Sequence, residues 1–161
     1  MEINFRRAEM ADLALLLTLV EEYYEFDQHP FEQSQMRLLL AEVLTDASCG
    51  YLWIIQQQAQ AIGYVFLTLG SYSLEYGGRD AFIDELYLRQ PARGQGWGRQ
   101  TIQFLLQTCA ALGIKALHLE VERQNLAAQA FYRQVGFRDQ DRYLMTQNIC
   151  ANFPASDNTQ S

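Results

Sequence analysis

A short glycine-rich stretch, Arg93-Gly94-Gln95-Gly96-Trp97-Gly98-Arg99, has the residue types and spacing best suited to binding chemistry in this sequence. Glycine has no Cβ, so the backbone can come close to a ligand. Where such a loop opens a helix, the free N–H groups and the helix dipole attract an anion. The two arginines add positive charge. The pattern predicts a phosphate or pyrophosphate site over residues 93–99.

Two better-known phosphate motifs do not fit this loop. A P-loop ends in Gly-Lys-Ser/Thr, whereas Gly98 is followed by Arg99 and Gln100. In a dinucleotide fingerprint the third glycine would stand where this chain has Arg99. A nucleotide-binding module is therefore disfavoured. For this loop alone, a plain tight turn between a strand and a helix stays open as the alternative.

A second informative stretch runs from Asn125 to Tyr132 and is followed by Gly136-Phe137. Asparagine is a good first cap for a helix, and a glycine just past the last turn commonly ends one. On its own, the stretch predicts a capped helix whose Phe131 and Tyr132 fill the core, because aromatic residues at helical spacing are usually buried.

The surrounding elements follow from the spacing of apolar residues and from the turn residues between them. Strands are predicted at 2–7, 51–56, 61–69, 81–88 and 115–121, with one or two closing strands over 137–149, and helices at 12–25, 32–45, 98–112 and 125–135. Residues 57–60 and 70–79 are predicted loops. This order predicts an α/β fold of three layers, with a mixed sheet covered by helices on both faces.

Composition limits the class of protein. The chain has 161 residues, enough for one domain, and a formal net charge of −7, which disfavours a nucleic-acid or anionic-membrane surface. Its three cysteines and two histidines are too scattered for a metal site or a disulfide framework. We expect residues 1–149 to form the single domain, residues 150–161 to be a disordered tail, and the protein to be cytoplasmic.

Taken together, the two stretches resemble the GNAT superfamily of acyl-CoA-dependent N-acetyltransferases. Residues 93–98 are similar to its R/Q-x-x-G-x-G/A pyrophosphate loop, and residues 125–137 to its N-x-x-A-x-x-x-Y-x-x-x-G-F region. The resemblance implies the GNAT-type fold, in which the mixed sheet splays between its central strands. It also implies acetyl-CoA as the acyl-donor cosubstrate, with no metal. Trp97 stands where the family usually has a smaller residue, and we expect it to pack beneath the loop helix.

The resemblance also implies roles for single residues. Loop residues 93–99 would hold the pyrophosphate mainly through backbone N–H groups, and Leu86, Tyr87 and Leu88 would pair with the pantetheine arm. Asn125 matches the asparagine that contacts the cofactor arm. Tyr132 matches the tyrosine that acts as general acid toward the departing thiolate in many members.

The acceptor amine must lose a proton, and Asp84 and Glu85 stand on the strand next to the thioester-binding positions. Neighbours on a strand point to opposite faces, so only one of them is expected to face the acceptor. Glu85 is slightly favoured as the base. The alternative is that both carboxylates complement substrate charge or are structural.

The acceptor site is the least specified part. Tyr24, His29, Tyr72 and Tyr76 are candidate substrate-binding residues, because aromatic walls with acidic tips can hold an amine. Half-exposed aromatics that simply cover the sheet are an equally good interpretation of each one.

The resulting hypothesis is an N-acetyltransferase that moves an acetyl group from acetyl-CoA to a primary amine of a small molecule or peptide, by direct attack in a ternary complex. The alternative is a non-catalytic acyl-CoA-binding sensor or regulatory domain. The family often dimerises, which leaves a homodimer open.

Overall fold

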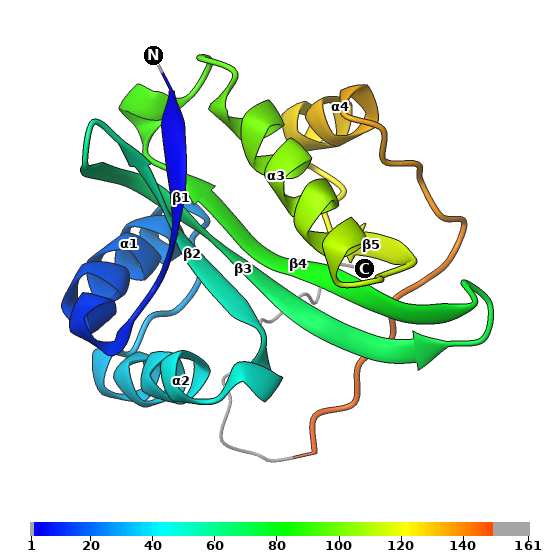
Figure 1. The fold of residues 1–161 in the computed structure, drawn as a ribbon, viewed down its shortest axis with the longest axis horizontal. Coiled ribbons are helices and arrows are strands. Elements are labelled where there is room, and N and C mark those ends of the chain that lie inside the picture. The colour runs from blue at the N-terminus through cyan, green and yellow to red at the C-terminus, as the bar shows by residue number, and fades with distance from the viewer. Residues whose placement is uncertain (1, 150–161) are drawn as a thin grey trace.

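The computed structural model describes residues 2–149, which form a five-stranded sheet with helices on both sides (Figure 1). The strands lie in chain order: β1 (Ile3–Arg7), β2 (Tyr51–Gln57), β3 (Gln60–Ser73), β4 (Gly78–Leu88) and β5 (Ala116–Leu119). Strands β1 to β4 are antiparallel neighbours, and β5 runs parallel to β4. The mixed sheet and the three layers confirm the predicted fold class.

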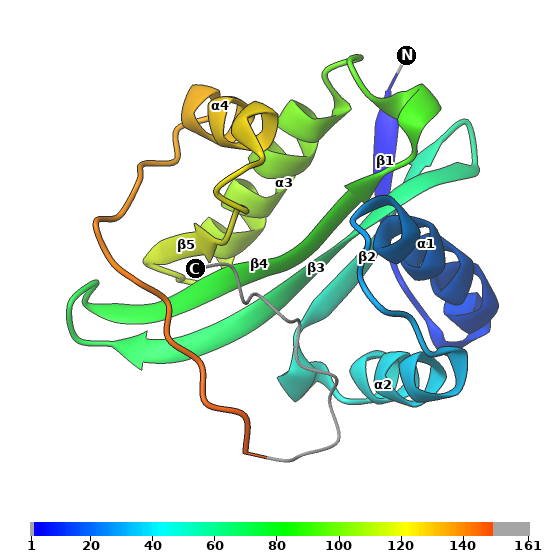
Figure 2. The ribbon, with the colours of Figure 1, turned by 180° about the vertical axis from the view of Figure 1, so that it is seen from behind.

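Two helices cover each face of the sheet (Figures 1 and 2). On one side lie α1 (Leu13–Phe26) and α2 (Gln33–Thr45), and on the other α3 (Trp97–Ala111) and α4 (Leu126–Gln134). Leu16 of α1 packs with Ile54 and Tyr64 in one core, whereas Leu105 of α3 packs with Ile83 in another. Short 3-10 turns lie at Met10–Asp12 (η1), Ala47–Cys49 (η2) and Gln90–Ala92 (η3).

The helix ends follow local sequence rules. Asn125 caps α4, since its Oδ1 accepts the N–H of Ala128 at 3.0 Å. The Glu32 side chain caps α2 by accepting the N–H groups of Ser34 and Gln35. Gly113, just past α3, has a φ of +71°, a left-handed conformation that glycine adopts readily. Asp12 precedes α1 as predicted, but its carboxylate is used by Arg6 and by the N–H of Glu9.

The loops on either side of β3 are shorter than predicted. Strands β2 and β3 meet at a two-residue turn, because Gln58 and Ala59 both take positive φ angles, +48° and +65°. A turn with two such residues matches the twist of an antiparallel pair. Strand β3 then continues to Ser73, so the predicted loop over 70–79 is reduced to residues 74–77. Glycine and serine in this stretch suggested a loop, but sheet pairing with β4 prevails.

The predicted closing strands over 137–149 are wrong. This segment contains no strand, and residues 138–149 are exposed along their whole length. An alternating pattern forms a strand only where one face is buried against a neighbour, and no buried face forms here. Two hydrogen bonds of 2.9 and 2.6 Å from Arg142 to the Glu75 carboxylate tie the segment to the turn after β3. The predicted tail, 150–161, lies outside the described residues.

The pairing of β4 with β5 stops halfway along β4. Asp80–Ile83 pair with Ala116–Leu119, and the rest of β4 has no β5 partner among the described residues (Figure 1). The sheet is thus splayed between these strands, as the resemblance implies. No helix in the part of the chain that is described is both long and apolar enough to cross a membrane.

Candidate active site

A β-bulge in β4 determines which carboxylate faces α1. Leu67 of β3 pairs with Ile83, but the preceding β3 residue, Phe66, pairs with Glu85, so Asp84 is the extra residue. In a regular strand, Glu85 would lie on the same face as Ile83, which packs in the core with α3. The bulge reverses the alternation. Glu85 therefore lies on the face covered by α1, and Asp84 is exposed.

The Glu85 carboxylate is held by two phenols. The hydroxyl of Tyr24 on α1 donates to Oε1 at 2.9 Å, and the hydroxyl of Tyr64 on β3 donates to Oε2 at 2.8 Å. Burial raises the pKa of Glu85 above its usual value, and these two hydrogen bonds oppose the shift. A carboxyl with a raised pKa at neutral pH is a better proton acceptor than an ordinary surface carboxylate.

Aromatic rings surround this carboxylate. Tyr23 packs edge-on against Tyr24 and Tyr64 at centroid distances of 5.8 and 6.4 Å. Tyr24 also contacts the rings of His29 and Phe31, which follow α1 in the chain, at centroid distances of 5.8 and 6.0 Å. The structure thus brings together two of the candidate acceptor residues, Tyr24 and His29, beside Glu85.

The other two candidate acceptor residues lie elsewhere. Tyr72 belongs to the far end of β3, where it pairs with Arg79. Glu85 lies six positions after Arg79 on β4, which at about 3.3 Å per residue amounts to roughly 20 Å. Tyr76 packs on His118 of β5 at 5.0 Å. Neither residue is brought next to Glu85.

The glycine loop opens α3 as predicted. Gly94 and Gly96 have φ angles of +74° and +83°, which disfavour any residue with a side chain. Gly96 is the residue that precedes the first turn of α3. No acceptor in residues 2–149 takes the N–H groups of residues 94–96. Together with the first turn of the helix, these groups form a set of unpaired donors suited to an anion.

The side chains of the loop are arranged unequally. Arg99 is exposed and has no ion pair within the described residues. Arg93 instead anchors the start of the loop: its Nε donates to the carbonyl of Leu88 at 2.8 Å, and its guanidinium lies 4.1 Å from the ring centre of Phe26. Gln95 Nε2 donates to the carbonyl of Pro91. These contacts fix the loop between the end of β4 and α1.

Trp97 packs beneath the start of α3, as expected. Only 6% of it is exposed, and it contacts the core formed by Ile62, Leu88 and Ala92. Its indole therefore lies under the loop and leaves the N–H groups above it open. Of this residue, only the backbone is available to a ligand.

Gly98 lets α4 pack against the first turn of α3. A Cβ added at this position would lie 3.1 Å from Cζ of Phe131, closer than side chains normally approach. The following residue, Tyr132, packs against the same core as Leu86 of β4 and Leu119 of β5. Because Phe131 packs on Gly98, the position of the neighbouring Tyr132 depends on the glycine loop.

Tyr132 belongs to α4, which lies on the face of the sheet opposite to α1, and it packs against the core beneath α3. Burial raises the pKa of its phenol, which stays protonated at neutral pH. An ionised Tyr132 would raise the pKa of Tyr23, which lies next to Tyr24 on α1. This coupling indicates that the phenols of α1 and α4 lie within electrostatic range of each other.

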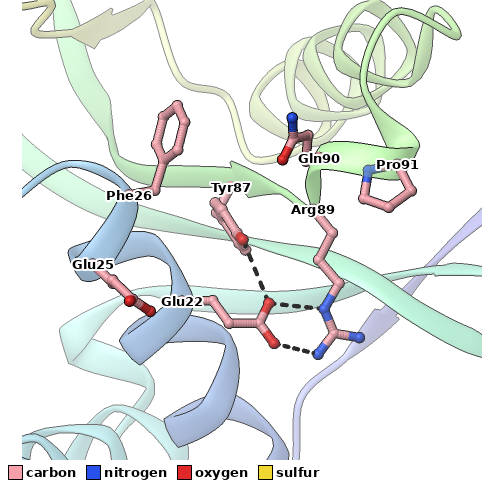
Figure 3. Close-up of a pocket in the computed structure, with 7 residues that line it drawn as sticks. All are labelled: Glu22, Glu25, Phe26, Tyr87, Arg89, Gln90 and Pro91. Carbon is pink, nitrogen blue, oxygen red and sulfur yellow. Dashed lines mark hydrogen bonds and ion pairs between the residues drawn. The ribbon is translucent and has the colours of Figure 1, made fainter.

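An open hollow of about 420 Å³ lies between the end of α1 and η3 (Figure 3). Arg89 donates two hydrogen bonds to Glu22, of 2.8 and 2.7 Å, and the Tyr87 hydroxyl lies 3.4 Å from the same carboxylate. The lining is completed by Glu25, Phe26, Gln90 and Pro91. Sequence reasoning missed this ion pair, because its members are 67 positions apart and belong to no motif.

The comparisons agree with this arrangement. The model of the acetyltransferase (GNAT) family matches residues 16–137, and the chain belongs to that family. The family supports acyl-CoA-dependent N-acetyl transfer in general, so the protein is an acetyltransferase.

Relatives and solved structures include other acetyltransferases. The uncharacterized N-acetyltransferase YhfO of Bacillus subtilis is 25% identical over 95% of this chain and 99% of its own. The uncharacterized N-acetyltransferase YycN of the same organism is 29% identical over 56% of this chain, and that match spans only 57% of YycN. A solved integron cassette protein, HFX_CASS3, from the mobile metagenome of Cole Harbour Salt Marsh, has a TM-score of 0.79 and 30% identity over 91% of this chain and 90% of its own.

Proposed function

We propose that this protein transfers an acetyl group from acetyl-CoA to a primary amine of a small molecule or peptide, by direct attack in a ternary complex. One observation carries the proposal. A carboxylate of raised pKa on β4 and a protonated phenol on α4 belong to the elements around the stretch where β4 is free of β5 and leads into a glycine loop with unpaired N–H groups.

The donor side uses backbone groups. The N–H groups of residues 94–96 and the first turn of α3 would bind the pyrophosphate, with Arg99 adding charge. The unpaired edge of β4 at Leu86–Leu88 would pair with the pantetheine arm, and a β4 N–H would polarise the thioester carbonyl. The Asn125 side chain is exposed at the start of α4, where it would contact the arm. When bound, acetyl-CoA supplies the activated acetyl group.

Two side chains would move protons. An alkyl ammonium has a pKa of about 10.4, so the acceptor must lose a proton before it attacks. Glu85 would accept that proton, and its raised pKa favours this role. Tyr132, kept protonated by burial, would donate to the departing thiolate. Asp84 would complement the charge of the acceptor from the exposed side of the bulge.

The names of two similar proteins favour an amine as the acceptor and acetyl-CoA as the donor. The bovine relative is named thialysine N-epsilon-acetyltransferase and is 24% identical over 85% of both chains. A predicted acetyltransferase from Clostridium acetobutylicum, solved with acetyl-CoA, shares this fold with a TM-score of 0.75 and 18% identity over 91% of this chain and 96% of its own.

Release of free thiol from acetyl-CoA in the presence of pooled primary amines tests the function. We expect thiol release that depends on the amine, with a matching acetylated product by mass spectrometry. Glu85→Gln should lower kcat/KM by about 10²-fold, the typical contribution of a general base. Asp84→Asn is the comparison variant: as a charge complement, Asp84 should affect the KM for the amine, and its loss should lower kcat far less than the loss of Glu85. Tight binding of acetyl-CoA without thiol release for any amine would instead indicate the sensor domain.

A further inference from the structure

Two tyrosines hold the Glu85 carboxylate, but they differ in access. Tyr64 is completely buried, with 0% of its surface exposed, and it lies in the core beneath α1. Tyr24 is only partly buried, and its ring contacts His29, which is exposed. One phenol therefore holds the carboxylate from inside the protein, and the other lies between the carboxylate and the surface.

We infer that Tyr24 is a catalytic residue that carries the proton of the acceptor amine to Glu85, whereas Tyr64 only positions the carboxylate. This inference rests on the proposed function and deepens it. It assigns the contact with the amine to a phenol on α1 instead of to the carboxylate on β4.

The transfer balances without any further reactant. The ammonium N–H donates to the lone pair of Tyr24 Oη while the Tyr24 O–H proton passes to Oε1 of Glu85. The ammonium N–H and the Tyr24 O–H bonds break, and a new Tyr24 O–H and a Glu85 O–H bond form. The products are a neutral amine, an unchanged tyrosine and a protonated Glu85. The observed 2.9 Å hydrogen bond is the second half of this path.

The surroundings suit Tyr24 to carry a proton and not to store one. Burial and the neighbouring Glu85 raise the pKa of Tyr24 well above its usual value, so no phenolate accumulates. The charged and titratable groups that face Glu85 are Tyr24 and Tyr23 of α1, Tyr64 of β3, Asp84 of β4 and His29 of the loop after α1. Tyr24 is the member of this set that both donates to Glu85 and contacts the exposed loop.

The experiment compares Tyr24→Phe with Tyr64→Phe, because each removes one hydroxyl and one hydrogen bond to the same carboxylate. Two probe amines are used with acetyl-CoA at pH 7: n-butylamine, which is protonated, and trifluoroethylamine, which is weakly basic and largely neutral. We expect Tyr24→Phe to lower kcat/KM for n-butylamine by about 100-fold, with the KM for acetyl-CoA unchanged. Its effect on trifluoroethylamine should stay below about fivefold, since that amine needs no proton removed before attack. Tyr64→Phe should cost less than about fivefold with either amine.

Three results contradict the inference in distinguishable ways. Equal losses in the two variants would show that both tyrosines only position Glu85. A loss in Tyr24→Phe that is equal for the two amines would show that Tyr24 holds the acceptor without taking its proton. No thiol release by the wild-type protein with either probe, or with pooled amines, would refute the proposed function itself.

Discussion

The hydroxyl of Tyr24 donates a 2.9 Å hydrogen bond to Glu85, a residue 61 positions further along the chain. This bond joins α1 to β4, the strand that leads into the glycine loop. Through it, α1 and β4 share one partly buried carboxylate. The proposed acceptor and donor sites therefore both border Glu85. Substitutions in either site should have a measurable effect at this residue.

Tyr132→Phe should reduce kcat by about 10²-fold and leave the affinity for acetyl-CoA nearly unchanged, because only the phenolic proton is lost and the ring still packs with Phe131 and Phe137. Steady-state kinetics measure kcat, and calorimetry measures the affinity for acetyl-CoA. Unaltered turnover would remove Tyr132 from the role of general acid.

Glu85→Gln should change the pH dependence of stability. A carboxyl whose pKa is raised by folding costs no stability below its unfolded pKa of about 4.3, and its cost grows as the pH rises through the folded value. The melting temperature of the variant, relative to wild type, should therefore be higher at pH 8 than at pH 4. A constant difference across this range would mean that burial does not raise the pKa of Glu85.

Gly98→Ala should disturb the cofactor loop through α4. The added Cβ meets Phe131 at 3.1 Å, and crowding of this kind costs about 1–3 kcal/mol. We expect a lower free energy of unfolding in urea and a higher KM for acetyl-CoA. Phe131→Leu, harmless or mildly destabilising alone, should restore part of the loss in the double variant. Strict additivity of the two changes would argue against this contact.

Glu22→Gln should weaken the tie between α1 and η3. The pair with Arg89 is partly exposed, with side-chain exposures of 33% and 29%, so we expect a loss of about 0.5–1 kcal/mol at pH 7. The hydrogen bonds from Arg89 lower the pKa of Glu22, so this stabilisation is present above the unfolded pKa of about 4.3 and is lost as the pH falls through the lower folded value. Urea unfolding at pH 7 and at pH 3 checks it, and an equal loss at both values would contradict the assignment.

The features predicted well from sequence are those set by neighbouring residues. The glycine loop, the Asn125 cap and the Gly113 stop each depend on a few consecutive positions, and all three appear where predicted. The alternation of apolar residues likewise placed the strands that lie within the sheet. The segment after α4 has the same alternation, but no neighbour covers it.

The features that could not be predicted depend on pairing between distant segments. The bulge at Asp84 is a property of the register between β3 and β4, and the residues of β4 alone do not reveal it. The contacts of Glu85 come from α1 and β3, which sequence patterns do not bring together. The structure places Glu85 on the face covered by α1, which regular alternation alone could not decide, and the preference for Glu85 over Asp84 as the base stays a prediction.

The single extra residue in β4 has a consequence for how this scaffold could diverge or be redesigned. The register of strand pairing, and not only strand composition, determines which chemistry is presented on each side of the sheet. If the bulge were removed with Asp84 paired opposite Phe66, the carboxylate of Glu85 would turn toward α3 and Leu86 toward α1, whereas deletion of Asp84 would leave both on their present faces. A register change here therefore acts as a functional substitution, and a graft of this strand into another framework must preserve the pairing with β3 as well as the sequence.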